Sequence, residues 1–255
     1  MEVWAKDTEY CWTGVAARLE WMALQQISLG KITLTKDNNV SVLSEYDVDY
    51  EIPADQKTGY QTGSTDWGNV SAKPIGKDFK GIVAAARKKG IHLKFAFMNV
   101  DTFAKFADTE EVQKKCASFA ANALDLQDTP DLDTVNKAMK KLAYLYGLQI
   151  VVIDQDITLE LADGSRPYSG NPFADDVVMF SETKQLGYTY WKTPADVKLQ
   201  GTAAIKAMNG HTLIKKFANE EPVEEVTMGV ANAFPAWLSS SRTYLMATNA
   251  SQWNH

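Results

Sequence analysis

The N-terminal part of the chain shows a helical pattern of apolar positions followed by an extended one. Between Tyr10 and Leu29, apolar side chains recur every three or four residues and form one stripe of a predicted helix: Trp12, Val15, Ala16, Leu19, Met22, Ala23 and Ile27. Gly30 follows as the left-handed residue with which such a helix ends. The segment KITLTKDNNVSVL, residues 31–43, then predicts two strands around an Asp-Asn-Asn turn. Strict alternation continues up to Pro53 through Tyr46, Val48, Tyr50 and Ile52.

The middle of the chain repeats the order of a helix and then a buried strand. Residues 54–76 have the composition of an exposed connection, pinned by Trp67, with a domain boundary near its end. A helix then carries Phe79, Ile82, Val83 and Ala86 and ends at Gly90. The strand IHLKFAFMNV follows, and its alternation puts four side chains on one face: Ile91, Leu93, Phe95 and Phe97. This order indicates an α/β unit.

Two further helices and a second strand complete this region. Asp101 and Asp108 are predicted N-caps of short helices, of which the second buries Val112, Cys116, Phe119 and Ala123. Thr129-Pro130 predicts the start of another helix, which ends at Gly147 and carries Leu132, Val135, Met139, Leu142 and Tyr146. The apolar run LQIVVID, residues 148–154, is typical of a central strand.

The C-terminal third returns to β-structure. Asp163-Gly164 predicts a hairpin turn, and DDVVMFSETKQLGYTYW, residues 175–191, reads as an apolar strand, a polar turn and a strand of alternating aromatic residues. Ala195–Met208 predicts a short connecting helix that Gly201 weakens. From His211 to Thr248 the chain is again predicted to be extended, with Pro235 interrupting it after the alternating Val226, Met228 and Val230.

Composition restricts the class of protein. The 255 residues are 45% apolar and allow one large or two modest domains. A net charge of −6 argues against a surface whose main task is to grip nucleic-acid phosphates. Cys11 and Cys116 lie far apart in helical stretches and predict reduced, packed thiols. The start of the chain lacks a secretion signal and no apolar run is long enough to span a bilayer, so we expect a soluble protein made inside the cell.

The search for chemistry gives no catalytic, cofactor-binding or metal site. The three histidines, His92, His211 and His255, lack metal-ligand spacing, and no local signature pairs them with either cysteine as a nucleophile and base. The acidic run Glu220, Glu221, Glu224 and Glu225 predicts a solvated surface, with an intersubunit charge contact as the alternative. Alternating Tyr188, Tyr190 and Trp191 could stack on bases, but without neighbouring basic clusters they are more typical of cross-strand packing.

One stretch resembles a magnesium-binding strand. In LQIVVIDQD, an apolar strand ends in Asp154 and Asp156, as in phosphate-binding ATPases. The accompanying phosphate loop is missing, because Gly30-Lys31 is followed by Ile32 rather than by Ser or Thr. We therefore interpret both aspartates as a solvated strand end.

Four segments in order resemble the major capsid proteins of tailed bacteriophages, in the branch called the phage capsid protein E family. The segment RLEWMALQQISLGKITL resembles the family's long spine helix and first strand, and FKGIVAAARKKGIHLKFAFMN resembles its next helix and strand. The pair LAYLYGLQIVVID and DDVVMFSETKQLGYTYW resembles the core of its axial domain, and VTMGVANAFPAWLSSSRTYLMA resembles its closing strands. The resemblance extends from about Tyr10 to Ala247.

The resemblance implies an α+β fold of the Hong Kong ninety-seven type. The peripheral domain, residues 1–75 and 205–255, would hold the spine helix and a β-sheet, and an axial α/β domain, residues 76–204, would be inserted in it. Tyr10–Ile52 would then pack with Thr212–Thr248, and Ile91–Trp191 would form the other domain. Family members begin with an N-terminal arm and an extended loop that lap over neighbours. We expect both to be missing here, so that this chain alone is a monomer or small oligomer and a chain with both elements forms large shells.

The implied function is structural, with no catalysis. The subunit would assemble as pentamers and hexamers into an icosahedral head around double-stranded DNA, with scaffold, portal and decoration proteins as further partners and no membrane contact. It would reside in the virion, and in the host cytoplasm before assembly. Two alternatives stay open: a small α/β hydrolase-like or nucleotide-dependent enzyme that uses Asp154 and Asp156, and a non-viral nanocompartment shell protein of the same fold. Neighbouring genes for portal and terminase would favour the phage head.

Overall fold

The computed structural model describes residues 2–35, 45–119, 129–159, 165–166, 168–198, 205–219 and 223–255. It is a mixed α+β structure that divides into two compact units. The first unit comprises Met1–Ala23 and Gly187–Trp237, and the second comprises Leu24–Leu186 and Leu238–His255. This grouping differs from the predicted peripheral and axial domains, so that the division into 1–75 with 205–255 and 76–204 stays a prediction.

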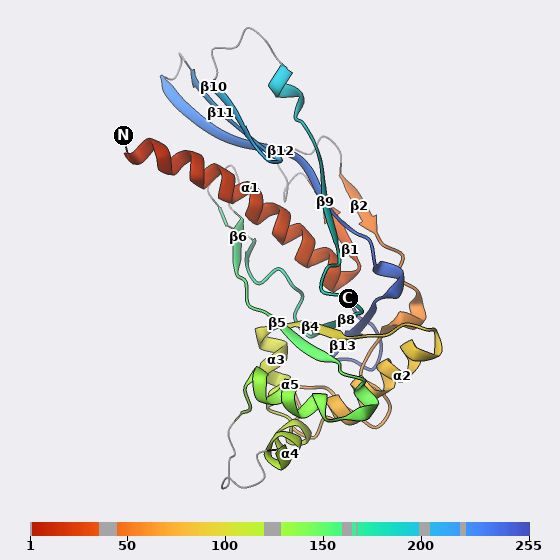
Figure 1. The fold of residues 1–255 in the computed structure, drawn as a ribbon. Coiled ribbons are helices and arrows are strands. Elements are labelled where there is room, and N and C mark those ends of the chain that lie inside the picture. Colours follow the sequence, from red (N-terminus) through yellow and green to blue (C-terminus); the bar gives the residue numbers. More distant parts are fainter. Residues whose placement is uncertain are drawn as a thin grey trace. The chain divides into compact units, whose positions relative to one another are not determined.

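The first unit contains the first part of helix α1 (Glu2–Leu29) and a four-stranded antiparallel sheet (Figure 1). The order of the strands in this sheet is β10 (Ile205–Asn209), β11 (Thr212–Asn219), β12 (Glu224–Trp237) and β9 (Gly187–Lys192). The backbone of α1 comes so close to β12 that a Cβ on Gly229 would lie 2.7 Å from the carbonyl oxygen of Cys11. Glycine is therefore required at position 229 for the helix to pack on this face of the sheet.

The second unit is built on a five-stranded sheet. Its order is β3 (Lys57–Thr58), β13 (Tyr244–Ala247), β8 (Val177–Ser181), β4 (Phe95–Asn99) and β5 (Gln149–Ile153). The pairs β3–β13 and β4–β5 are parallel, and β8 is antiparallel to both of its neighbours. Two further pairs of strands form separate two-stranded antiparallel sheets. They are β1 (Lys31–Leu34) with β2 (Tyr46–Asp49), and β6 (Ile157–Leu159) with β7 (Tyr168–Gly170).

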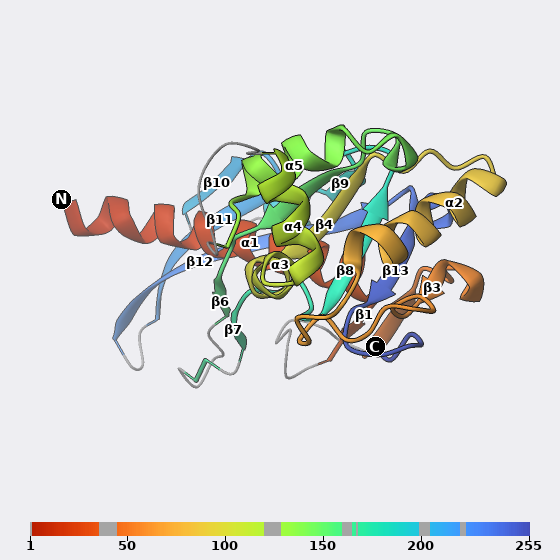
Figure 2. The same cartoon turned by 90° about the horizontal axis from the view of Figure 1, so that it is seen from below.

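Helices cover one face of the five-stranded sheet. They are α2 (Lys80–Lys88), α3 (Val100–Ala107), α4 (Glu110–Phe119) and α5 (Leu132–Lys140), and they lie in front of the strands in Figure 2. A π-helical turn, η2 (Pro74–Phe79), leads into α2. Alternate strand residues enter the shared core from the sheet: Ala96, Met98, Ile150, Val178, Phe180, Tyr244 and Met246. The other face is also buried at Val177, Met179 and Leu245, as expected for a sheet covered on both sides.

The predicted N-terminal helix and the strand after it are confirmed, but the helix begins at Glu2, eight residues before the predicted start at Tyr10. The helix ends at Leu29, and Gly30 has a φ of 76°. Strands β1 and β2 pair with Lys31 opposite Asp49, but β2 ends before Tyr50. The predicted turn and strand at residues 36–44 lie outside the described residues.

Several predicted helix boundaries are wrong. The N-cap of α3 is Asn99, whose side chain accepts from the N–H of Thr102, while Asp101 lies in the first turn and Asp108 caps the C-terminus of the same helix. The N-cap of α5 is Asp131 rather than Thr129-Pro130. That helix ends at Lys140, and a 3₁₀ turn, η3 (Ala143–Leu145), precedes Tyr146. Phe119 and Ala123, predicted on the buried side of α4, have side chains outside the described set, while Val112 and Cys116 are buried as predicted.

Three strand predictions also need correction. The strand after Gly90 begins only at Phe95, and Ala96 and Met98, not Phe95 and Phe97, join Ile91 and Leu93 in the core. The run 148–154 forms β5 at the edge of the described sheet instead of its centre. The predicted helix at Ala195–Met208 is a short 3₁₀ turn, η4 (Ala195–Lys198), and then β10, with residues 199–204 outside the described set. The Asp163-Gly164 turn also lies outside the described residues.

Pro235 does not interrupt its strand. Strand β12 continues to Trp237 and pairs Pro235 with Thr189 of β9. Just after the strand, the N–H of Leu238 donates to the carbonyl of Leu186, and bonded and non-bonded pairs alternate along antiparallel strands. Pro235 lies three residues before Leu238 and is therefore at a non-bonded site, where its missing N–H would point away from β9. On that side, β11 pairs with β12 only as far as Ala231, and proline is tolerated there.

A side chain of α5 completes the outer edge of β5. The N–H of Ile150 donates to Oδ1 of Asn136 at 2.7 Å, and Nδ2 of Asn136 donates to the carbonyl of Ile150 at 3.1 Å. The carboxamide thus takes the place that a neighbouring strand would occupy at this residue.

Candidate assembly surfaces

Among the described residues, the acids and thiols that the sequence singled out are not gathered into a reactive site. Asp154 and Asp156 are both exposed in the turn between β5 and β6. Burial raises the pKa of the Cys116 thiol and of the Cys11 thiol, which opposes formation of a nucleophilic thiolate. Within the part of the chain that the structure describes, no three His, Cys, Asp or Glu residues are placed to hold a metal ion.

The three histidines lie in different surroundings. The ring of His92 is exposed, with Nδ1 3.3 Å from a guanidinium nitrogen of Arg87. His255 packs edge-on against Trp253, with ring centroids 5.4 Å apart, and burial lowers its pKa. His211 lies in the turn between β10 and β11.

We expect the double substitution Asp154→Asn, Asp156→Asn to change the free energy of unfolding by less than about 0.5 kcal/mol. Both carboxylates are solvated, and surface substitutions away from special features have small effects. Urea unfolding followed by circular dichroism measures this change. A magnesium-dependent phosphodiesterase or nucleotidase activity that disappears in the double variant would favour the enzyme alternative instead.

The aromatic strand β9 is an exposed edge. Tyr188 and Tyr190 are each 57% exposed and Trp191 is 51% exposed, so that their rings are not buried by cross-strand packing. Their partners on β12 are Ala236, Phe234 and Ala233. Among the described residues, β9 pairs with no strand on its other side. An unpaired strand edge with large exposed apolar side chains is a surface suited to another protein chain.

The two tyrosines of β9 share the sheet face that α1 leaves uncovered in the first unit. Gly229 faces α1, and the register puts Tyr188 and Tyr190 on the opposite face together with even-numbered residues of β12 such as Met228. Met228, on the part of β12 that pairs with β11, is also 41% exposed on this face.

A buried carboxylate organises the connection before α2. Oδ1 of Asp78 accepts the N–H of Gln61 at 2.7 Å, and Oδ2 accepts the hydroxyl of Ser64 at 2.9 Å and the indole N–H of Trp67 at 2.8 Å. Asp78 is fully buried, and this desolvation raises its pKa to about 6, against the lowering effect of the three hydrogen bonds. The sequence prediction that Trp67 pins this connection is confirmed, since its side chain is only 1% exposed.

Sequence reasoning missed Asp78, although a signal was present. It is an acidic residue next to Phe79 on the apolar stripe that continues through Ile82 and Val83. A carboxylate at such a position requires buried hydrogen-bond donors nearby.

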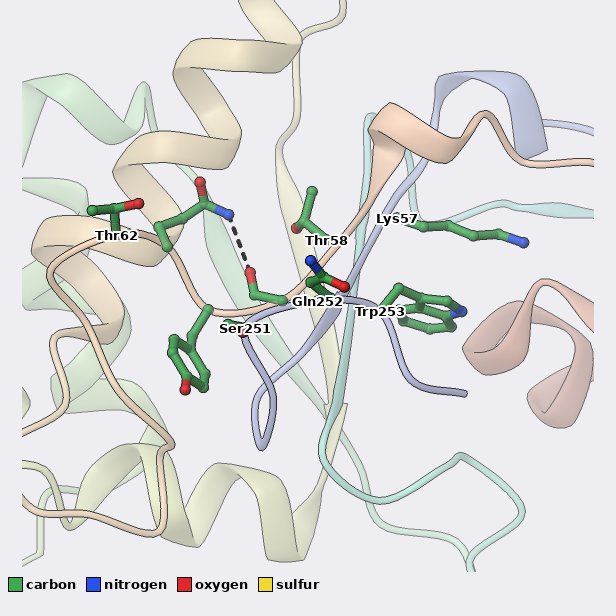
Figure 3. A pocket seen from close by; sticks show the side chains of 9 residues that line it. Lys57, Thr58, Thr62, Ser251, Gln252 and Trp253 are labelled. Atoms are coloured by element: carbon green, nitrogen blue, oxygen red, sulfur yellow. Dashed lines mark hydrogen bonds between the residues drawn. The ribbon is translucent and has the colours of Figure 1, made fainter.

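A shallow pocket lies where the C-terminal segment crosses the residues after β3 (Figure 3). Its lining is rich in hydroxyl and amide groups and contains no carboxylate, histidine or thiol: Lys57, Thr58, Gly59, Tyr60, Gln61, Thr62, Ser251, Gln252 and Trp253. The N–H of Tyr60 donates to the carbonyl of Ala250 at 2.9 Å, and a Cβ on Gly59 would lie 2.1 Å from the same oxygen. The pocket is therefore a seam that ties down the C-terminal segment.

The comparison with protein families identifies the chain as a structural protein of a phage. The model for phage major capsid protein E matches residues 1–238, and the chain belongs to this family. Membership of this family supports a structural role in a phage. None of the described helices combines the length and the apolar character needed to cross a membrane.

The other comparisons add little. No curated protein matches the chain. Among solved structures, a phage-related protein from Bordetella bronchiseptica RB50 is similar at 16% identity, with a TM-score of 0.46. The match covers 78% of this chain and 57% of that one, so the chain spans less than two thirds of the length of its structural neighbour.

Proposed function

We propose that this chain is the shell subunit of an icosahedral phage or prophage head. In this proposal it has the Hong Kong ninety-seven-type fold and assembles as pentamers and hexamers around double-stranded DNA. Scaffold, portal and decoration proteins are its further partners. The subunit is made in the host cytoplasm and ends in the virion. The observation that carries the proposal is the family match over residues 1–238.

The surface of β9 supports a role in assembly. Subunits of closed shells bind through several separate patches, and aromatic side chains that are exposed before assembly are enriched in such patches. Tyr188, Tyr190 and Trp191 have this property on a strand edge with backbone groups available for pairing. The net charge of −6 is also compatible with DNA that lies inside a shell without adhering tightly to it.

The proposal is tested by expressing the protein together with the genes that flank it and purifying the resulting particles. We expect closed shells in negative-stain micrographs, with this chain as their most abundant protein by mass spectrometry and with nuclease-protected DNA inside. Shells that enclose enzymes instead of DNA would favour the nanocompartment alternative. A chain that is well expressed but absent from the particles would contradict the proposal.

A further inference from the structure

One exposed face of α2 carries only positive charge. Going from η2 into α2, the basic residues on this face follow at helical spacing, and we call them the basic face: Lys77, Lys80, Arg87 and Lys88. The opposite side of the helix is buried through Phe79, Ile82 and Ala86. No member of the basic face forms an ion pair with any carboxylate of the residues described; the neighbouring Lys89 does, with Asp55.

Two aromatic rings hold this face in place. The guanidinium of Arg87 lies 3.7 Å from the ring centroid of Tyr146, and Nζ of Lys80 lies 5.4 Å from that of Tyr144. Tyr146 adopts a left-handed conformation with a φ of 51°, which is costly for a residue other than glycine. Its side chain is 57% exposed, and its ring lies against the guanidinium of Arg87, which is thereby ordered before any partner arrives.

Strand β2 and the turn after it carry the opposite charge. Asp47, Asp49 and Glu51 are exposed at alternate positions, and we call them the acidic edge. β1 places Thr33 opposite Asp47 and Lys31 opposite Asp49, so that Lys31 offsets part of the charge of Asp49. Oδ1 of Asp49 also accepts the N–H of Glu51. Neither Asp47 nor Glu51 forms an ion pair with a residue in the described ranges.

The two surfaces carry their charges at short intervals. Two extended residues separate Asp47 from Asp49 by about 7 Å, and the chain turns at Glu51, which has a φ of 49°. Three helical residues separate Lys77 from Lys80 by about 5 Å. Exposed charges of opposite sign at similar spacing attract each other, although each pair is weak alone.

We infer that the basic face of one subunit binds the acidic edge of a second copy of this chain. This inference rests on the proposed shell function, because it takes the partner to be another subunit. The contact joins two different patches and is therefore heterologous, which is the type of contact that closes into rings such as pentamers and hexamers. The alternative occupant of the basic face is duplex DNA, and the experiment below separates the two.

The test exchanges the charges of the two surfaces. One variant carries Lys77→Glu and Lys80→Glu, and the other carries Asp47→Lys and Glu51→Lys. In each variant alone, the exchanged positions then face charges of the same sign, while Arg87, Lys88 and Asp49 keep theirs, whereas a mixture of the two restores opposite signs at the exchanged positions. A single chain with all four substitutions restores them as well. Arg87 and Asp49 are left unchanged because of their contacts with Tyr146 and with Glu51.

Sedimentation velocity at about 50 mM salt measures the association. We expect each variant to associate about tenfold more weakly than the parent chain, and the equimolar mixture and the four-substitution chain to regain the parent level. The regained association should weaken again at high salt. The matched control Lys6→Glu, Lys198→Glu makes the same charge change at exposed residues of the first unit that lie outside β9 and should leave association unchanged. Circular dichroism checks that all variants are folded.

Carbodiimide coupling locates the contact even where association is weak, because it joins amines to carboxylates that touch. With equal amounts of ¹⁴N- and ¹⁵N-labelled chain, we expect mixed-isotope peptides that link Lys77 or Lys80 to Asp47 or Glu51. Their absence, together with a mixture that associates no better than its separate components, overturns the inference.

DNA binding gives a different pattern. If a 30-base-pair duplex binds the parent chain and not the Lys77→Glu, Lys80→Glu variant, while the mixture of variants does not associate, the basic face belongs to DNA and the inference is wrong. Failure of the proposed function can be distinguished from failure of the inference. If the charge exchange restores association but the chain is never found in particles, the proposed function is wrong and the inferred contact still holds. Conversely, shells made of this chain with no rescue in the mixture contradict only the inference.

Discussion

Replacing Asp78 with alanine is expected to lower the free energy of unfolding by about 4 kcal/mol at pH 4. At pH 7 we expect the same substitution to lower it by only about 1 kcal/mol. The substitution leaves three donors, on Gln61, Ser64 and Trp67, without their acceptor, and each unsatisfied buried donor costs about 1–3 kcal/mol. Urea unfolding of both proteins at several pH values measures the difference.

The dependence on pH comes from the parent protein. The folded-state pKa of Asp78, about 6, lies above its ordinary value of 3.8, so the folded state favours the protonated carboxyl. This contribution to stability is fully present below pH 4 and is lost as the pH rises to about 6. A pKa difference of about 2 corresponds to about 3 kcal/mol. The alanine variant has no titrating group at this position, and the cost of the substitution therefore shrinks as the pH rises.

The variant Asp78→Asn provides the control. It keeps an acceptor oxygen and does not titrate, so we expect a smaller cost with the same trend in pH. A cost that instead grows between pH 4 and pH 7 would mean that the folded protein lowers the pKa of Asp78.

The second large effect is expected from Phe106→Ala, at about 3–5 kcal/mol of unfolding free energy. Phe106 is fully buried and packs against Trp67, Phe79 and Phe103 at centroid distances of 5.3, 5.5 and 6.2 Å. Removing a buried aromatic ring loses its transfer free energy and leaves a cavity. Denaturant unfolding followed by fluorescence measures the effect, and Phe106→Leu should cost less than half as much because it fills most of the space.

Tyr190→Ala is the matched surface comparison. The ring of Tyr190 is 57% exposed, and cross-strand pairs contribute less than about 1 kcal/mol. We therefore expect nearly unchanged stability together with weaker assembly in light scattering. If Tyr190→Ala destabilises the fold as much as Phe106→Ala does, β9 belongs to the core and is not an assembly surface.

Elements with a strong local signal could be predicted from the sequence. Helix α1 has a long stripe of apolar residues, and Gly30 marks its end with a conformation that few other residues adopt. The sequence predicts two strands in residues 175–191; β8 lies within this range, and β9 begins in it and ends one residue beyond, at Lys192. Each of these signals lies within a few neighbouring residues, where periodicity and turn chemistry are informative.

Pairing between distant strands could not be predicted in this way. β8 and β9 follow each other closely, as the strands of a hairpin would, yet β8 pairs with β4 and β13 while β9 pairs with β12. The C-terminal β13 belongs to the same sheet as β4 and β5, which the predicted domain division places apart from it. Alternation tells which side of a strand is buried, but the partner is decided by the packing of the whole sheet.

The prediction of the helix cap of α3 was wrong for a related reason. Asn99 and Asp101 both have side chains that can cap α3, and the choice depends on which residue is still extended when the helix begins. The strand β4 reaches Asn99 and holds it extended, so that Asn99 becomes the cap. The sheet, rather than the local sequence, sets this boundary.

The two hydrogen bonds between Asn136 and Ile150 affect which contacts a newly made chain can form in a crowded cell. Newly made shell proteins accumulate to high concentration, and an open strand edge can then recruit the wrong chain faster than the correct surfaces meet. The carboxamide of Asn136 occupies the backbone groups of Ile150 from within the same chain. At this residue the edge of β5 is therefore closed to off-pathway pairing as soon as α5 has docked, while β9 keeps its unpaired edge for a partner.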